Sequence, residues 1–278
     1  MGFMDPGNVV WFEIATADGA AVREFYGSLL GWTFAVDPDS SVDGSTYTRI
    51  TAPGMPFPMG AIHERAGSAE EAMNVSIVSA DVAADQARLE ELGAKVIVPT
   101  TAVCDVTVFA RLADPRGNVF SLFQNGESPK RLKEFAESCQ AQMTEVAMMP
   151  KPGAYAWFEI GTADAEATRA FWTAAFGWRV EFDESAGGKP YSNVFTGNQW
   201  PSGGVYDLGT GGVDYLMPDF LVLDVPAVTA NAVELGATVE FGPDTNPDGL
   251  LYSRLIDPRG NRFGLFSIPT THPTGTGA

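Results

Sequence analysis

The apolar and polar residues near the start of the chain follow two different periods. The run VVWFEIAT at 9–16 is short, apolar and rich in β-formers, so it predicts a strand. Asp18 then provides a helix N-cap, and Gly31 provides a helix stop. Between them the apolar residues recur at helical spacing, at Val22, Phe25, Tyr26, Leu29 and Leu30. The pattern predicts a strand followed directly by a helix.

Three β-prone runs follow this helix, around WTFAV, STYTRI and MGAIHE, and turn residues separate them, which predicts a βαβββ unit. A second unit of the same kind begins at MNVSIVSADV. It has a helix over 82–92 and the further runs AKVIV, VTVFARLA and NVFSLFQ. Between its last two strands, DPRGN at 114–118 has Asp, Pro and Gly where a type I turn favours them, so we expect a hairpin there.

The whole pattern returns in the second half of the chain. WFEI at 11–14 recurs at 157–160, and DPRGN at 114–118 recurs at 257–261. We therefore predict two domains, 1–125 and 153–278, that arose by tandem duplication. The segment 126–152 between them has balanced charges and flanking Pro and Gly, which favours a linker with a short helix.

Composition narrows the class of protein. The chain has 278 residues with 45% hydrophobic content, enough for two ordinary cores. No apolar run reaches the roughly 18 residues that a membrane helix needs, so we expect a cytoplasmic protein. A formal net charge of −18 disfavours nucleic acid and membrane surfaces as partners. Cys104 and Cys139 lack motif spacing, which favours free thiols. We expect a small-molecule ligand and a monomer or homodimer.

Four βαβββ units, the helix exit FYGSLLGW at 25–32, the step ELGAKV at 91–96 and the repeated DPRGN resemble the vicinal oxygen chelate superfamily. That superfamily includes glyoxalase I, extradiol dioxygenases and bleomycin-resistance proteins. The resemblance implies an α+β fold of two tandem glyoxalase-like domains, each of two paired βαβββ units curled around a cleft. It also implies that metal-dependent members carry His, Glu or Gln ligands on the first and last strand of each unit.

This sequence departs from the metal-dependent pattern. The ligand positions fall on Trp11 and Ser121 in the first half and on Trp157 and Gly264 in the second, and none of these is a His or a carboxylate. The chain also has only two histidines, too few for the usual zinc or iron site. We therefore expect no metal and no cofactor, and we do not carry over the activities that depend on one.

Strand alternation selects the candidate site residues. If Phe12 and Ile14 face the helices, then Trp11 and Glu13 face the cleft, and the repeated residues do the same in the second half. Glu13 and Glu159 are the candidate catalytic bases. The candidate ligand-binding residues, from the first, third, fourth and seventh strands of the halves, are Trp11, Tyr47, Arg49, His63, Phe109, Arg111, Trp157, Tyr191, Tyr252 and Arg254.

Two interpretations of the repeated acid and base stay open. Glu13 with Arg111, and Glu159 with Arg254, fit structural ion pairs that hold two units together. They equally fit carboxylates that face a ligand, with a pKa raised by an aromatic wall. A third-strand arginine, Arg49, occurs in the first half alone, so we expect the working site in the first half.

The leading functional hypothesis is a metal-free protein that binds a small aromatic or apolar metabolite in a domain cleft, as bleomycin-resistance proteins of this superfamily do. The first alternative is a metal-independent isomerase, lyase or cyclase of secondary metabolism that uses a cleft glutamate as base. The second alternative is a scaffold or a module that binds a protein partner. The fold alone does not distinguish these three functional hypotheses.

Overall fold

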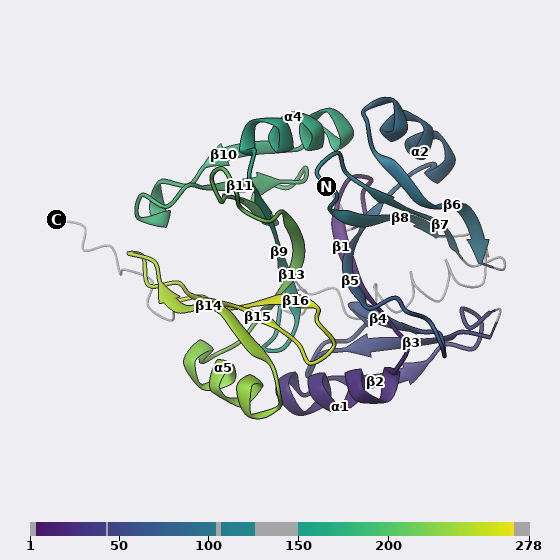
Figure 1. The fold of residues 1–278 in the computed structure, drawn as a ribbon, viewed down its shortest axis with the longest axis horizontal. Helices are drawn as coiled ribbons and strands as arrows, with labels where there is room; N and C mark the ends of the chain where they lie inside the picture. Colours follow the sequence, from purple (N-terminus) through teal and green to yellow (C-terminus); the bar gives the residue numbers. More distant parts are fainter. Residues whose placement is uncertain (1–3, 43, 104–106, 126–149, 270–278) are drawn as a thin grey trace.

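The computed structural model of the protein describes residues 4–42, 44–103, 107–125 and 150–269. These residues form two eight-stranded mixed sheets that lie back to back, with helices at the outer faces (Figure 1). The helix expected in the linker falls on residues 126–149, outside the described residues, as do Cys104, Cys139 and His272. No helix in the described ranges is long and apolar enough to cross a membrane.

The first sheet has the strand order β2-β3-β4-β1-β5-β8-β7-β6. β1 runs parallel to β4, β5 runs parallel to β8, and β1 pairs with β5 in the antiparallel sense, so two βαβββ units join through their first strands. The elements are β1 (Val9–Thr16), α1 (Gly19–Leu30), β2 (Thr33–Val36), β3 (Thr46–Thr51), β4 (Gly60–Glu64), β5 (Ala72–Val78), α2 (Val82–Glu91), β6 (Lys95–Val103), β7 (Thr107–Ala113) and β8 (Val119–Asn125).

The second sheet repeats this order as β10-β11-β12-β9-β13-β16-β15-β14. The predicted fold of two tandem glyoxalase-like domains is therefore confirmed. The elements are β9 (Tyr155–Thr162), α4 (Ala165–Phe176), β10 (Arg179–Phe182), the 3-10 helix η2 (Glu184–Ala186), β11 (Tyr191–Phe195), β12 (Gly203–Asp207), β13 (Tyr215–Leu221), α5 (Val225–Glu234), β14 (Thr238–Thr245), β15 (Leu251–Ile256) and β16 (Arg262–Ser267).

The local signals act as the sequence predicts. The Asp18 carboxylate accepts a hydrogen bond from the backbone of Ala21 at 3.0 Å and so caps α1. Gly31 ends the helix with a φ of 70°, a left-handed conformation that favours glycine. DPRGN forms the expected hairpin, in which the Gly117 amide donates to the Asp114 carbonyl at 2.9 Å.

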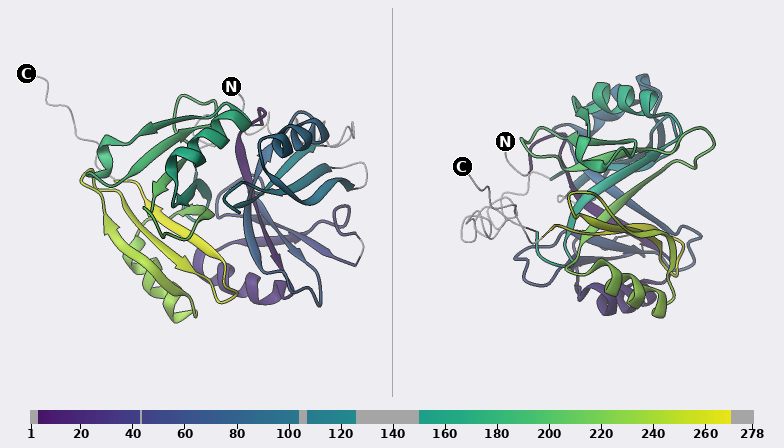
Figure 2. Two further views of the ribbon diagram at one scale, coloured as in Figure 1. Left: turned by 45° about the horizontal axis from the view of Figure 1, so that its top comes forward. Right: turned by 90° about the vertical axis from the view of Figure 1, so that its left-hand side faces the viewer.

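Each hydrophobic core combines units from both halves of the chain. One core joins the first unit, with Phe12 and Trp32, to the fourth unit, with Phe220 and Phe263. The other joins the second unit to the third. Accordingly, α1 lies beside α5 and α2 lies beside α4 (Figures 1 and 2). The two halves therefore share their cores.

Hydrogen bonds also cross between the halves. The Tyr26 hydroxyl donates to Asp257 at 3.0 Å, and the Trp178 indole donates to the Gly7 carbonyl at 2.9 Å. The arginines of the two DPRGN turns add ion pairs, Arg116 with Asp214 and Arg259 with Glu71. The repeated turn thus has a second structural role, because it ties one half to the other.

Candidate functional site

Each of the two sheets curls around an open side that faces away from the other sheet (Figure 1). The predicted site residues lie on strands β1, β3, β4 and β7 of the first sheet and on strands β9, β11 and β15 of the second. Phe12 and Ile14 are fully buried in the helix-covered core, whereas Glu13 between them points the other way and contacts Arg111. Phe158 and Ile160 are likewise in a core on either side of Glu159. We call the faces of the two sheets that lie opposite the helices the first and second concave faces.

On the first concave face, Glu13 forms an ion pair with Arg111. Nη2 of Arg111 donates to Oε1 of Glu13 at 2.6 Å, and Nη1 of Arg111 donates to Glu70 at 2.5 Å. The Arg111 side chain is only 6% exposed. Glu13 therefore neutralises a buried arginine, and the ion pair joins β1 of the first βαβββ unit to β7 of the second. This is the structural ion pair that the sequence analysis gave as one interpretation.

The other first-half candidates lie around this pair. The rings of Tyr47 and His63 are 6.2 Å apart on adjacent strands, and Trp11 hydrogen-bonds the Tyr47 phenol. Burial and the Glu13 charge raise the pKa of Tyr47 well above its usual range. Arg49, however, is bonded to Asp37 at 2.5 Å.

Phe109 lies two residues before Arg111 on β7, where it pairs with Phe123 of β8. The first concave face thus carries the predicted residues, and its two arginines are already bound to carboxylates.

On the second concave face, Glu159 has a different environment. The Tyr215 hydroxyl donates to Oε1 of Glu159 at 2.5 Å, whereas Nε of Arg254 is 3.5 Å from the same oxygen. Burial raises the pKa of Glu159 above its ordinary value, and the Arg254 charge and the Tyr215 hydrogen bond offset this only in part. Glu159 is therefore a buried carboxyl that is less fully neutralised than Glu13.

Aromatic side chains surround this carboxyl. The Trp157 indole donates to the Tyr191 hydroxyl at 2.9 Å. The Arg254 guanidinium lies 5.2–5.3 Å from the ring centres of Tyr206, Tyr215 and Phe241. Tyr252 lies further out, where it stacks on Phe241 and is bonded to Lys189 and Asp244. The predicted residues Trp157, Glu159, Tyr191 and Arg254 are thus brought together, and Tyr252 is at their edge.

Asp219 of β13 is a further polar residue of this face that the sequence analysis missed. It pairs across the sheet with Trp157 of β9 on one side and with Gly264 of β16 on the other. It is 8% exposed, and its Oδ2 atom has no hydrogen-bond partner among the described residues. Burial and the Glu159 charge raise its pKa well above the ordinary range, against the opposing effect of Arg254.

The strand pairing aligns the positions at which metal-dependent relatives carry ligands in both halves of the chain. In the second half they are Trp157, Asp219 and Gly264, and the Asp219 carboxyl fills the space where a side chain at position 264 would begin. In the first half they hold an indole and two hydroxyls, from Trp11, Ser76 and Ser121.

Indole and glycine supply no ligand atom, so these residues do not fit a metal of the family's kind. Within the described part of the chain, no three His, Cys, Asp or Glu side chains are grouped so that they could hold an ion. We therefore derive no step through a metal.

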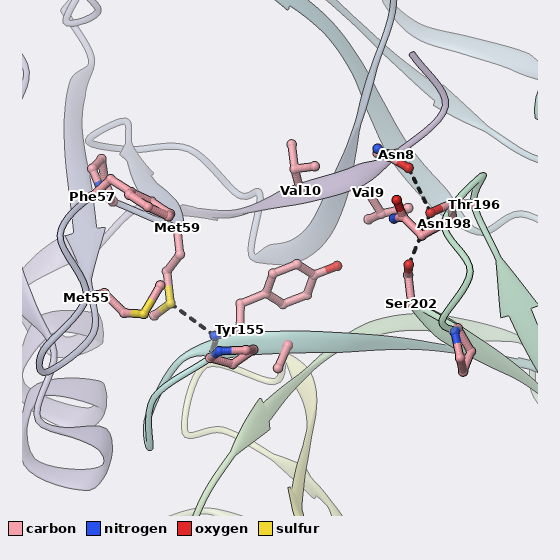
Figure 3. Close-up of a pocket in the computed structure, with 14 residues that line it drawn as sticks. Asn8, Val9, Val10, Met55, Phe57, Met59, Tyr155, Thr196, Asn198 and Ser202 are labelled. Carbon is pink, nitrogen blue, oxygen red and sulfur yellow. Dashed lines mark hydrogen bonds between the residues drawn. The ribbon is translucent and has the colours of Figure 1, made fainter. Parts of the chain in front are cut away.

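A cavity of about 200 Å³ lies elsewhere, between the two halves (Figure 3). Tyr155 extends into it from β9, and the Thr196 hydroxyl donates a hydrogen bond to Oδ1 of Asn8 at 3.0 Å across its polar end. A bulge in the pairing of β9 with β13 separates Tyr155 from the face that carries Trp157. The cavity is lined by Asn8, Val9, Val10, Met55, Phe57, Pro58, Met59, Pro150, Tyr155, Ala156, Thr196, Asn198, Pro201 and Ser202.

The sequence pattern of the glyoxalase-like domain matches residues 11–123 and 157–266, the segments that build the two sheets. The chain therefore belongs to the glyoxalase-like domain family, within the vicinal oxygen chelate superfamily that its motifs resemble.

Similar proteins include one with a biosynthetic role. The chain is 29% identical over 286 residues to the anthracycline biosynthesis protein DauV of Streptomyces sp. (strain C5), with 96% of each chain covered. It superposes on homoprotocatechuate 2,3-dioxygenase from Arthrobacter globiformis with a TM-score of 0.60 and 20% identity, covering 98% of this chain and 83% of that one. It also superposes on the Mn(II)-bound glyoxalase from Novosphingobium aromaticivorans with a TM-score of 0.59 and 16% identity, covering 94% of this chain and 82% of that one. At these identities the solved structures show a shared fold.

Proposed function

We propose that the protein binds a small, planar, oxygen-bearing aromatic metabolite on its second concave face without a metal. The observation that carries this proposal is the group of Glu159, Asp219 and Arg254 beneath aromatic side chains. Buried polar groups with incomplete hydrogen bonding gain free energy when a ligand supplies the missing partners. Aromatic side chains beside them favour a flat apolar ligand that carries a few polar atoms.

The similarity to DauV supports the class of ligand. DauV is an anthracycline biosynthesis protein, and the similarity extends over almost the whole of both chains. Compounds of that kind combine a flat ring system with carbonyl and hydroxyl oxygens, which suits three polar side chains beneath aromatic rings. The ligand class that we propose is therefore a polycyclic aromatic with such oxygens.

The first concave face is less suited to this role, although the sequence pointed to it. Arg111 already has Glu13 and Glu70 as partners, and Arg49 has Asp37. A ligand would have to compete with these ion pairs. We therefore assign the first face a structural role and place the ligand on the second.

Tryptophan fluorescence tests the assignment. We expect 1,8-dihydroxyanthraquinone to quench the emission of the protein as it binds, because it stacks near Trp157. Trp157→Phe should lose most of the quenching, and Trp11→Phe, the matched change in the first half, should retain it. Absence of binding, or loss of quenching in Trp11→Phe alone, would contradict the proposal.

A further inference from the structure

The cavity between the two halves lies where matching segments of the repeat meet. Val9 and Val10 of β1 line it on the side of the first half. Tyr155 and Ala156 of β9, which hold the same positions in the repeat, line it on the side of the second half. The loop after β3 and the loop after β11 complete its wall. The cavity is therefore built by both halves, and none of the candidate residues of the concave faces is among its described lining residues.

The two loops differ in their chemistry. The loop after β3 supplies Met55, Phe57 and Met59 to the wall. The loop after β11 supplies Asn198 and Ser202 instead. In Figure 3 the sulfur-bearing and aromatic side chains of the first loop lie at one end of the cavity, and the amide and hydroxyl side chains lie at the other. The divergence of the repeat has thus given the cavity an apolar end and a polar end.

The polar end has both a donor and an acceptor for a ligand. The Thr196 hydroxyl donates to Oδ1 of Asn8, and its oxygen is 3.2 Å from the Ser202 hydroxyl oxygen. Each hydroxyl oxygen has two lone pairs, so this pair of hydroxyls can accept a further hydrogen bond. The Tyr155 hydroxyl extends toward the same end, and no hydrogen bond joins it to the other described lining residues (Figure 3). Burial raises the pKa of Tyr155 well above its ordinary value, so this hydroxyl keeps its proton and can donate.

The lining also limits the charge and the size of a ligand. None of the described residues that line the cavity is Asp, Glu, Lys, Arg or His, so a charged ligand would lose its hydration without gaining a partner. The volume is about 200 Å³. Since a cavity of about 150 Å³ can hold benzene, this one holds a single substituted ring but not three fused rings. Pro150 at its edge is exposed and Pro201 is half-buried, so solvent reaches this side of the cavity.

We propose that this cavity is a second ligand site, separate from the second concave face, and that it takes a small neutral phenol. The ring of the phenol packs against Met55, Phe57 and Met59, because thioether and aromatic side chains make favourable contacts with aromatic rings. The hydroxyl of the phenol accepts a hydrogen bond from Tyr155 and donates one to Ser202. A ligand in this place contacts both halves of the chain and stabilises their junction.

Isothermal titration calorimetry with 4-methylphenol tests this inference. We expect saturable binding of one molecule per chain. The affinity should be the same when 1,8-dihydroxyanthraquinone is present at saturation, because that compound is too large for the cavity. In 4-methylbenzoate a charged group replaces the hydroxyl, so it should bind at least about tenfold more weakly than 4-methylphenol.

Variants of the lining residues locate the site. Tyr155→Phe removes the donor and keeps the ring, so it should weaken the binding of 4-methylphenol by about 2–10-fold. Ser202→Ala removes the acceptor and should weaken it by a similar factor. Ala156→Leu fills part of the cavity and should abolish binding. Tyr47→Phe, the same change on the first concave face, should keep the wild-type affinity. Thermal melting checks that each variant is folded, and the two hydroxyl variants decide the location if Ala156→Leu does not fold.

The outcomes separate this inference from the proposed function. Absence of saturable binding by 4-methylphenol, or wild-type affinity in both Tyr155→Phe and Ser202→Ala, would overturn the second site. Competition between 4-methylphenol and the anthraquinone would place both on the concave face and would also overturn it. Tyr155→Phe should still show the wild-type quenching by the anthraquinone. A protein that binds 4-methylphenol as described but not the anthraquinone would keep the second site and lose the proposed function.

Discussion

The carboxyl group of Asp219 lies directly over Gly264 and fills the space that a larger residue at position 264 would occupy. The matching residues of the first half are Ser76 and Ser121, which also pair across the sheet, and Ser121 accepts a hydrogen bond from Asn74. The same place in the repeated strand order therefore holds a small hydroxyl pair in one half and a buried acid over a glycine in the other. The two concave faces have diverged at the positions where metal-dependent relatives carry ligands.

Gly264→Ala should destabilise the protein, because the new methyl group collides with the Asp219 carboxyl. Overpacking of this kind typically lowers the free energy of unfolding by about 1–3 kcal/mol. Denaturant unfolding measures the cost. In an Asp219→Ala background the same change should cost much less, because the colliding atoms are gone. Equal costs in both backgrounds would contradict the placement of Asp219.

Asp219→Asn should alter the pH dependence of stability. The pKa of Asp219 is raised in the folded state, so its protonation contributes stability that is complete below its ordinary pKa of about 3.9 and is lost as pH rises through the raised value. The asparagine stays neutral at every pH. The free energy of unfolding of the variant, relative to wild type, should therefore increase as the pH rises above about 4. A difference that stays constant as the pH rises would show that Asp219 is not a buried acid.

Glu13→Gln and Glu70→Gln should differ in cost, although both glutamates bind Arg111. The Glu13 side chain is 17% exposed and that of Glu70 is 48% exposed. Loss of a charged hydrogen bond to a buried group typically costs about 1–3 kcal/mol, whereas exposed ion pairs contribute about 0–1 kcal/mol. Thermal unfolding should therefore show the larger loss for Glu13→Gln, and a larger loss for Glu70→Gln would contradict the structural role of Glu13.

Tyr26→Phe tests how the two halves are held together. Its hydroxyl donates to Asp257, which is 4% exposed, so the change leaves a buried carboxyl oxygen with one partner fewer. We expect a cost of about 1–3 kcal/mol in the free energy of unfolding.

Arg259→Ala is the control for Tyr26→Phe, because Arg259 also bridges the halves but forms a more exposed ion pair with Glu71. Its cost should be at most about 1 kcal/mol. Because the cores are shared, fluorescence and circular dichroism should follow one common transition in every variant. Separate transitions for the two halves would contradict the shared cores.

Much of the fold follows from local signals in the sequence. Asp18 and Gly31 set the ends of α1, alternation places Glu13 opposite Phe12, and DPRGN forms its hairpin. These features depend on neighbours within a few residues. The packing of the first unit against the fourth depends on residues that are distant in the sequence. Periodicity shows which face of a helix is apolar but not which partner covers it. For that reason the shared cores could not be predicted.

The candidate site also combines features that the sequence predicts with features that only the structure shows. The Glu–Arg pairs were foreseen from the repeat, yet only the three-dimensional geometry separates the 2.6 Å contact of Glu13 from the 3.5 Å contact of Glu159. Asp219 was missed because the candidates came from the first, third, fourth and seventh strands of each half, whereas Asp219 lies on β13, the fifth strand of its half. Its signal was an acidic residue inside an otherwise apolar run. Its meaning depends on Trp157 and Gly264, which are distant in the sequence.

The location of the bound ligand is best decided by a crystal structure of the protein with 1,8-dihydroxyanthraquinone. We predict density for the ligand on the second concave face, with its ring against Trp157 and its oxygen atoms within hydrogen-bond distance of Asp219 and Arg254. Density on the first concave face near Arg111, or in the cavity beside Tyr155, would contradict the assignment of the site.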